Sequence, residues 1–331
     1  MDLLQAVILG IVEGITEYLP ISSTGHLVLA QWALGLEGHD DNVYAIVIQG
    51  GAILAVLGLY RRRVGQMLRG LMGRCGAGLK LAINLIIAFL PALVLGPLLD
   101  DRIESALLRP LPVVIALAAG GILMLFAARW QRSAFHEGDD ARSFIDIEHL
   151  TWKRALLIGL LQCVAMIPGT SRSMMTIVGG MAVGMRPKHA AEFSFLLGLP
   201  TLGGATVFKI IKDPGALNSL GWLPSIVGIA VAFIAAAIAI KWLVAYLSSH
   251  GLAIFGWYRL ALSAVIAIGL YSGALSLPGN NPSGPEDVSM APASSIFQND
   301  QPPPPASAAT QTAPPTSSGP TTLIQFPSNT T

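Results

Sequence analysis

Apolar residues form long uninterrupted stretches along residues 1–277. Six of these stretches are long enough to cross roughly 30 Å of hydrocarbon as helices. They lie at about residues 43–60, 79–99, 111–128, 190–211, 220–243 and 252–273. The pattern therefore predicts six full transmembrane helices.

Some further apolar segments are too short to span a bilayer as helices, and they lie at about residues 3–12, 27–36, 155–167 and 174–185. They form two pairs, and each pair flanks a polar centre that contains glycine and proline. Broken pairs of this kind are typical of re-entrant helices, whose irregular backbone lies at membrane depth. We therefore expect two re-entrant helix pairs besides the six spans, in an all-α integral membrane protein.

The two short pairs begin two halves of the chain in the same way. Gly10-Ile-Val-Glu13 matches Gly159-Leu-Leu-Gln162, and each segment leads through a proline into a Ser/Thr-rich turn. The match indicates a weak internal repeat, with halves at about residues 1–128 and 155–273. One re-entrant pair and three spans in each half make an odd number of crossings, which predicts an inverted-topology repeat.

The composition agrees with a membrane protein and separates a tail from it. Of 331 residues, 53% are apolar and only 12% are charged, with a mean hydropathy of +0.63. The net charge of +1 gives no indication of nucleic acid binding. Residues 278–331 hold 12 of the 22 prolines and little charge, so we expect a disordered Pro/Ser/Thr-rich tail after a membrane domain at residues 1–277.

Basic residues predict the orientation in the membrane, because short cytoplasmic loops collect Lys and Arg. The predicted loop after the first full span carries Arg61, Arg62, Arg63, Arg69, Arg74 and Lys80. We therefore expect residues 61–80 on the cytoplasmic side and the C-terminal tail outside. The first broken pair then enters from outside and the second from inside, so that their polar tips meet near the middle of the membrane.

The first tip combines acids with hydroxyls and a histidine. Glu13 and Glu17 are four residues apart, which places both carboxylates on one helix face within reach of a single cation. Ser22 is a good N-cap for the helix that follows. Ser23 and His26 share a face of that helix and pair a hydroxyl with a group that exchanges protons near neutral pH. We predict Ser23 as a nucleophile with His26 as its proton partner, but spacing alone also allows His26 as the nucleophile.

The start of a helix after each tip is a ready anion site, because its backbone N–H groups are free. The second tip repeats this arrangement and adds Arg172, whose planar guanidinium suits phosphate oxygens. The predicted phosphate-binding residues are Ser22, Thr24, Gly25, Thr170, Ser171, Arg172 and Ser173. Acids for a metal, donors for phosphate and a Ser/His pair together indicate phosphoryl chemistry.

A purely structural reading stays open for each of these groups. Glu13, Glu17 and Arg172 could form an ion pair that only joins the halves, and the hydroxyls could only satisfy freed backbone groups. Three ionisable groups at membrane depth would cost on the order of 9 kcal/mol, which favours a functional role. Glu192 could line a pore or lie at the interface, and the sequence does not separate these readings.

These residues also carry a family resemblance. The stretch from Glu13 to His26, the segment Pro168-Gly-Thr-Ser-Arg172-Ser and Glu192-Phe-Ser-Phe resemble the undecaprenyl-diphosphate phosphatase family of the bacitracin-resistance type. The resemblance covers about residues 1–275. Met174 stands where the family usually has glycine, and the tail is not part of the family pattern.

The resemblance implies a bacterial inner-membrane enzyme whose active site opens to the outer face. Its reaction would be hydrolysis of undecaprenyl diphosphate to undecaprenyl phosphate and inorganic phosphate, which recycles the lipid carrier for cell-wall synthesis. It also implies a divalent cation, Mg²⁺ or Ca²⁺, with Glu13 and Glu17 as its ligands. The functional residues it implies are Glu13, Glu17, Ser23, Thr24, His26, Ser171, Arg172 and Ser173. The sequence leaves the oligomeric state undetermined.

Two functions of other classes compete with the phosphatase. Secondary transporters also place broken helices at the membrane midplane, so the protein could carry a lipid phosphate or another anion. A non-catalytic membrane scaffold would fit the tail but would leave the paired polar motifs without a purpose.

Overall fold

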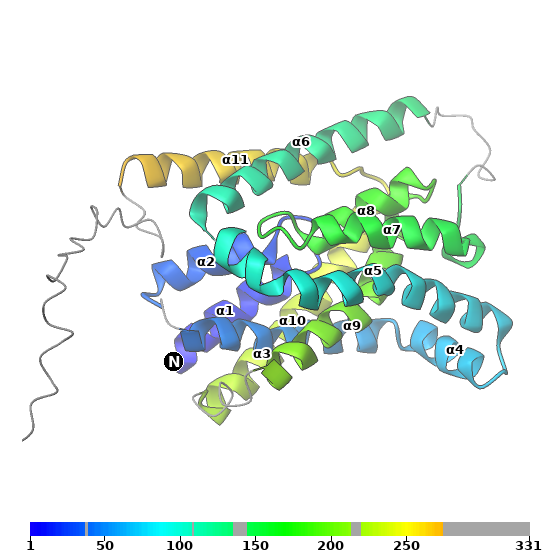
Figure 1. The fold of residues 1–331 in the computed structure, drawn as a ribbon, viewed down its shortest axis with the longest axis horizontal. Coiled ribbons are helices and arrows are strands. Elements are labelled where there is room, and N and C mark those ends of the chain that lie inside the picture. The colour runs from blue at the N-terminus through cyan, green and yellow to red at the C-terminus, as the bar shows by residue number, and fades with distance from the viewer. Residues whose placement is uncertain (37–38, 108, 135–143, 213–219, 274–331) are drawn as a thin grey trace, which may run out of the picture. The chain divides into compact units, whose positions relative to one another are not determined.

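The computed structural model describes residues 1–36, 39–107, 109–134, 144–212 and 220–273. Within these ranges the chain is helical, with an isolated bridge contact between Ile145 and Met185 but no strand (Figure 1). The predicted all-α class is therefore confirmed. The predicted tail at residues 278–331 lies outside the described residues.

The helices follow one another with short connections. Those of the first half are α1 (Leu3–Thr16), α2 (Ser23–Ala33), α3 (His39–Leu59), α4 (Arg61–Leu71), α5 (Gly76–Leu107) and α6 (Pro110–Ala134). After a short 3₁₀ helix, η2 (Ile147–His149), the second half contains α7 (Trp152–Val164), α8 (Arg172–Ala182), α9 (Pro187–Lys212), α10 (Trp222–Leu247) and α11 (Ala253–Tyr271).

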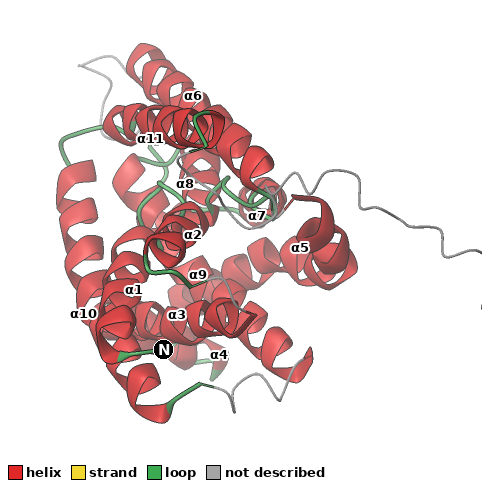
Figure 2. Ribbon diagram, turned by 90° about the vertical axis from the view of Figure 1, so that its left-hand side faces the viewer, coloured by secondary structure: helices red, strands yellow, loops and turns green. Residues whose placement is uncertain are grey.

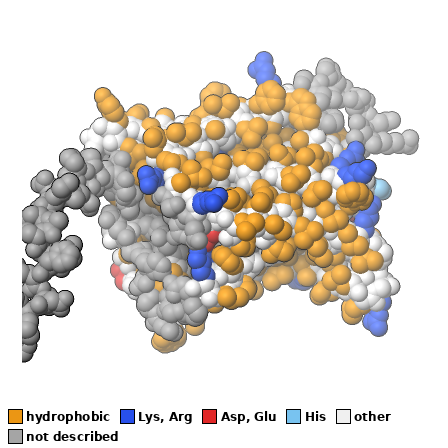
Figure 3. All heavy atoms as spheres, viewed as in Figure 1, with side chains coloured by type: hydrophobic (Ala, Val, Ile, Leu, Met, Phe, Trp, Pro, Cys, Tyr) orange, Lys and Arg blue, Asp and Glu red, His pale blue; other side chains and the backbone are white. Residues whose placement is uncertain are grey.

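Five helices are long and apolar enough to cross a membrane, namely α5, α6, α9, α10 and α11. A sixth span results if α3 and α4 are counted together, although the chain bends by 79° between them. The protein is thus a multi-pass membrane protein with five to six spans. Figure 3 shows apolar side chains over much of the viewed face, with a group of Lys and Arg at the end where Figure 1 places α4.

The helix α4 corrects the sequence analysis, which treated residues 61–80 as a loop. Arginine lowers the mean hydropathy of this segment but favours the helical backbone. The arginines Arg61, Arg62 and Arg69 share α4 with exposed Leu68 and Leu71. A short helix of this composition is amphipathic, and a search for apolar stretches does not detect it.

Arg63 ties α4 to two other segments at this end of the molecule. Its Nη1 donates to Glu148 Oε1 at 2.8 Å and its Nε donates to Glu192 Oε1 at 3.0 Å. The hydrogen bond from Arg63 lowers the pKa of Glu148. Glu192, whose role the sequence left open, is therefore an ion-pair partner that joins α9 to α4.

The short segments form α1, α2, α7 and α8, with 14, 11, 13 and 11 residues. At 1.5 Å per residue, the longest reaches about 21 Å and cannot cross the hydrocarbon alone. α1 packs against α10, α7 packs against α5, and α6 lies beside α11 (Figures 1 and 2). Gly14 and Gly159 permit the first two contacts, because a Cβ at either position would collide with the backbone of the facing helix.

Candidate active site

The two polar tips are in direct contact. Arg172, the first residue of α8, donates from Nη2 to Glu17 Oε1 at 3.1 Å. Next to it, Ser173 Oγ donates to the carbonyl of Leu19 at 2.8 Å. One ion pair and one hydrogen bond therefore join the α1–α2 turn to the start of α8, as the sequence predicted for the tips.

Glu17 connects the positive charge to a hydroxyl. It caps the C-terminus of α1 and is 6% exposed. While Oε1 accepts from Arg172, Oε2 accepts from Ser23 Oγ at 2.7 Å. The result is a hydrogen-bonded chain, Arg172–Glu17–Ser23, which places a carboxylate against the hydroxyl that it would deprotonate.

Arg172 is positioned by more than its ion pair. Its Nη1 donates to the Ser194 carbonyl on α9 at 2.9 Å, and its guanidinium lies 5.5 Å from the centre of the Tyr18 ring. The Nε atom is buried and has no hydrogen-bond partner in the described part of the chain. The guanidinium is thus held in one place while donor capacity remains for a ligand.

Glu13 lies one helical turn before Glu17 and is 1% exposed. Its Oε1 atom is buried without a hydrogen-bond partner among the described residues. A buried carboxylate oxygen of this kind needs a cation or a donor to offset its lost hydration. Glu13 and Glu17 together therefore fit a divalent cation.

The available carboxylates favour a cation whose coordination shell is completed by water and by phosphate oxygens. Within the described ranges, no cluster of three or more His, Cys, Asp or Glu side chains could hold a metal ion. Mg²⁺ commonly takes one or two carboxylates and completes its shell with water and substrate phosphate oxygens. Two carboxylates beside an anion site are sufficient for that mode of binding.

Both helix starts have the same unusual backbone. Ser22 and Ser171 are the N-caps of α2 and α8, and their φ angles are +77° and +76°. A non-glycine residue in this region costs about 1–3 kcal/mol and persists only where the surroundings enforce it. The Ser22 side chain accepts from the N–H of Gly25, and the Ser171 side chain accepts from the N–H of Met174. Met174, the departure from the family pattern, thus leaves the capping bond intact.

The other predicted anion-site residues lie close to these caps. Thr24 and Gly25 are in the first turn of α2, and Thr170 precedes the cap of α8. Ser171 Oγ and Ser173 Oγ are 3.0 Å apart and hydrogen-bonded. The structure therefore groups all seven predicted residues at two adjacent helix starts.

His26 has partners other than Ser23. Its Nδ1 is 2.7 Å from the Ser22 carbonyl, and its Nε2 is 2.7 Å from the Tyr258 hydroxyl on α11. The two rings are also stacked, with 6° between their planes. Ser23 instead bonds to Glu17, so the geometry pairs the serine with a carboxylate, and not with the histidine that the spacing suggested.

Arg259 is a residue of this region that the sequence analysis missed. It is 0% exposed and donates from α11 to the carbonyls of Leu117, Ala116 and Gly169. Gly169 belongs to the second tip, so Arg259 ties that tip to α6 and α11. The signal was present in the sequence, because Arg259 is the only charged residue in the predicted span 252–273.

Comparisons with known proteins agree on one family. The model of the family described as "Bacitracin resistance protein BacA" matches residues 6–265. A protein of Acinetobacter baumannii called undecaprenyl-diphosphatase is 44% identical over 81% of this chain and 95% of its own length. Undecaprenyl-diphosphatase 1 of Paraburkholderia xenovorans is 42% identical over 82% and 96%, and the Sorangium cellulosum undecaprenyl-diphosphatase is 45% identical over 79% and 84%.

Replacing Arg259 with leucine tests its structural role. Three buried carbonyls lose a charged donor, so we expect a loss of about 2–5 kcal/mol of stability. Thermal unfolding of the detergent-solubilised protein measures it. The matched control is Trp257→Leu, at a neighbouring side chain that is 64% exposed, which should leave the unfolding temperature nearly unchanged. Equal unfolding temperatures for the two variants would contradict the assignment.

Proposed function

This chain belongs to the bacitracin resistance protein BacA family and is an undecaprenyl-diphosphate phosphatase, and from that premise we propose how its residues perform the hydrolysis. The products are undecaprenyl phosphate and inorganic phosphate, and the reaction returns the lipid carrier to cell-wall synthesis. The observation that carries the mechanism is the Arg172–Glu17–Ser23 chain between two helix starts.

In the first step, Ser23 Oγ attacks the terminal phosphorus of the diphosphate. Glu17 Oε2, which accepts from this hydroxyl at 2.7 Å, takes its proton and passes it to the departing bridging oxygen. The phosphoanhydride bond breaks, undecaprenyl phosphate leaves, and the phosphoryl group stays on Ser23. In the second step, Glu17 takes a proton from an attacking water and returns one to Ser23 Oγ, which releases inorganic phosphate.

Charge on the transferring group is stabilised by groups that are already in place. Arg172 offers its free donors to the terminal phosphate, and the first-turn N–H groups of α2 and α8 that the caps do not bind would donate to the same anion. The hydroxyls of Thr24, Thr170 and Ser171 add donors at the same helix starts. Because Ser194 and Tyr18 already hold the guanidinium, little reorganisation is needed during the reaction.

Glu13 and Glu17 are the proposed ligands of a divalent cation, Mg²⁺ or Ca²⁺. When bound, this cation neutralises charge on the phosphate oxygens. The unpartnered Glu13 Oε1 supports the assignment.

We assign His26 to positioning, and Ser23 to the nucleophilic attack. Both ring nitrogens of His26 have close partners, one on the cap residue Ser22 and one on α11. These contacts hold the start of α2 against α11 and so fix the direction of Ser23.

A secondary transporter is not favoured, because the similar proteins are named as diphosphatases.

The arrangement of helices supports the inverted repeat. If α1, α2, α3, α5 and α6 correspond to α7, α8, α9, α10 and α11, then the α1–α10 contact corresponds to α7–α5, and α3–α10 corresponds to α9–α5. The paired contacts, the matching positive φ angles and the short helices agree with two re-entrant pairs related by a two-fold axis in the membrane plane.

The location we propose is the bacterial inner membrane, with the active site open to the outer face and the C-terminal tail outside. Support comes from the basic residues on α4 and its turn, which favour a cytoplasmic location. The diphosphate would then reach the site from the outer leaflet.

Replacement of the catalytic pair should nearly abolish phosphate release from undecaprenyl diphosphate. Ser23→Ala removes the nucleophile and Glu17→Gln removes the base, so we expect a reduction in kcat of at least about 100-fold for each. Ser248→Ala, at the end of α10, is the matched control and should keep the normal rate. A radiolabelled phosphoenzyme that persists in Ser23→Ala but disappears in His26→Ala would instead make His26 the nucleophile.

Removal of divalent cations should stop the reaction. Purified protein dialysed against EDTA is expected to release phosphate at a small fraction of its normal rate, and added Mg²⁺ or Ca²⁺ should restore it. Glu13→Gln should raise the cation concentration needed for half-maximal rate by about tenfold, since one of two charged ligands is lost. Full activity after exhaustive chelation would rule out the cation site.

Labelling of single cysteines tests the orientation. Cys75 is a free thiol in the turn between α4 and α5, and a membrane-impermeant maleimide should label it in inside-out vesicles but not in spheroplasts of a Cys163→Ser variant. A Ser272→Cys variant without the native cysteines should show the opposite preference. Labelling of Cys75 in intact spheroplasts would reverse the proposed topology.

A further inference from the structure

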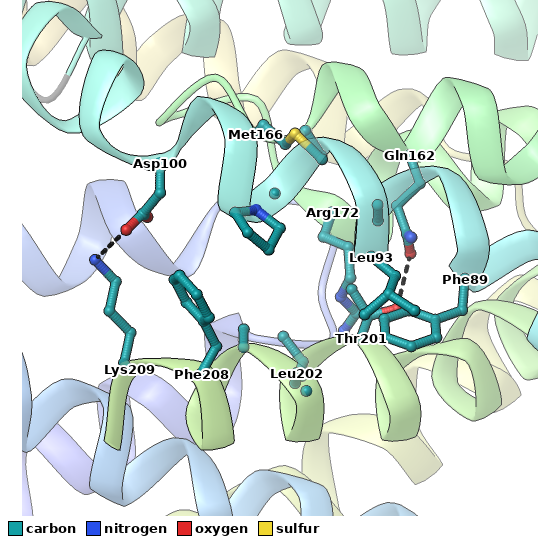
Figure 4. Close-up of a pocket in the computed structure, with 16 residues that line it drawn as sticks. Phe89, Leu93, Asp100, Gln162, Met166, Arg172, Thr201, Leu202, Phe208 and Lys209 are labelled. Carbon is teal, nitrogen blue, oxygen red and sulfur yellow. Dashed lines mark hydrogen bonds and ion pairs between the residues drawn. The ribbon is translucent and has the colours of Figure 1, made fainter. Parts of the chain in front are cut away.

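A cavity of about 300 Å³ lies between α5, α7 and α9, next to the site described above. Arg172 forms part of its wall, and most of the remaining surface is apolar, with Phe89, Leu93 and Phe208 among the lining side chains. Figure 4 shows Arg172 reaching into this space, between the Asp100–Lys209 ion pair at one end and Gln162 at the other. The cavity thus extends away from the reacting groups and into an apolar environment.

Gln162 is, like Arg172, a polar side chain in this wall that lacks a complete set of partners among the described residues. It is 3% exposed, and its Oε1 accepts from Thr201 Oγ1 at 3.3 Å. Its Nε2 is buried and has no hydrogen-bond partner among the described residues. A buried amide N–H without a partner is unfavourable, so its retention beside Arg172 points to a ligand that accepts a hydrogen bond.

When the two halves of the chain are aligned, Gln162 of α7 corresponds to Glu13 of α1. In the same alignment Met166, in the turn after α7, corresponds to Glu17, which follows α1. The second half therefore has an amide and a thioether at the positions where the first half has two carboxylates, and it lacks their negative charge. An amide and a thioether provide no negative charge for a divalent cation, but they suit the junction between a phosphate and a hydrocarbon chain.

We propose that this cavity receives the first isoprene units of the substrate, and that Gln162 Nε2 donates to an oxygen of the phosphate that carries the chain. The inference rests on the proposed function and adds a place for the lipid. Arg172 binds the terminal phosphate, and Gln162 binds the proximal one. The apolar walls on α5 and α9 enclose the chain, which would leave between these helices toward the bilayer.

Filling the cavity tests the place of the chain. Ala92 on α5 lines it, whereas Val94 on the same helix is 58% exposed and does not line it. Ala92→Phe should weaken binding of a methylene-bridged, non-hydrolysable undecaprenyl diphosphate analogue by about tenfold, with a similar rise in KM. Val94→Phe, the matched control, should bind within about twofold of the unmodified protein. Unchanged affinity in a folded Ala92→Phe protein would overturn the proposal and would indicate a void filled only by bilayer lipid.

Variants of Gln162 test the hydrogen bond. Gln162→Leu should raise KM for undecaprenyl diphosphate by about tenfold with a smaller effect on kcat, because a contact to the non-reacting phosphate is lost. Gln162→Glu places a carboxylate beside that phosphate and should raise KM by about 100-fold. A KM for Gln162→Glu equal to that for Gln162→Leu would contradict donation to a phosphate.

Failure of the proposed function and failure of the cavity assignment would give different results. If the unmodified protein releases no phosphate from undecaprenyl diphosphate, the proposed function fails, while binding of the analogue still reports on the cavity. If the unmodified protein is active and the Ala92 and Gln162 variants match it in KM, the function stands and the cavity assignment is wrong. Size-exclusion profiles of each variant confirm that folded protein is compared.

Discussion

A carboxylate and a guanidinium buried against each other are the constraint on which this structure depends. Glu17 and Arg172 have side chains only 5% and 10% exposed. Charges removed from water are tolerated only when paired and further hydrogen-bonded, and this pair has Ser23, Ser194 and the Tyr18 ring around it. Glu17 lies in the first half of the chain and Arg172 in the second. The pair can therefore form only where the helix breaks of the two halves lie next to each other. The structural and the catalytic readings of the pair are therefore compatible.

The residues around the pair act as a support for it. Strained backbone at Ser22 and Ser171 persists because the capping bonds and the packing of α2 and α8 leave no alternative. Arg259 binds carbonyls of the second tip and of α6, and His26 links the first tip to α11. Both tips are thus attached to the α6–α11 pair. Such support keeps donors in place before the substrate arrives, which is the main source of electrostatic stabilisation in enzymes.

Much of the fold follows from apolar length alone, because a bilayer imposes a minimum span and excludes unpaired backbone. The same rule did not detect α4, because its arginines lower the hydropathy of this segment. The chain bends by 79° between α3 and this helix. The candidate site residues could be selected from the sequence because charge is rare in it. Their pairing was not predictable: Ser23 and Glu17 are joined across a non-helical turn, whereas helix spacing relates Ser23 only to His26. Arg259 was missed because it lies in a full span and not in a broken one.

If the two halves form the proposed inverted repeat, the difference between Glu13 and Gln162 makes its two copies unequal. Two identical halves facing one centre would offer a diphosphate two equivalent orientations, and its two phosphorus atoms would meet identical surroundings. An acid in one copy and an amide in the other remove that degeneracy. In the proposed arrangement the first copy supplies the nucleophile and its base, whereas the second supplies Arg172 and the amide that would hold the lipid phosphate. This asymmetry would select a single productive pose.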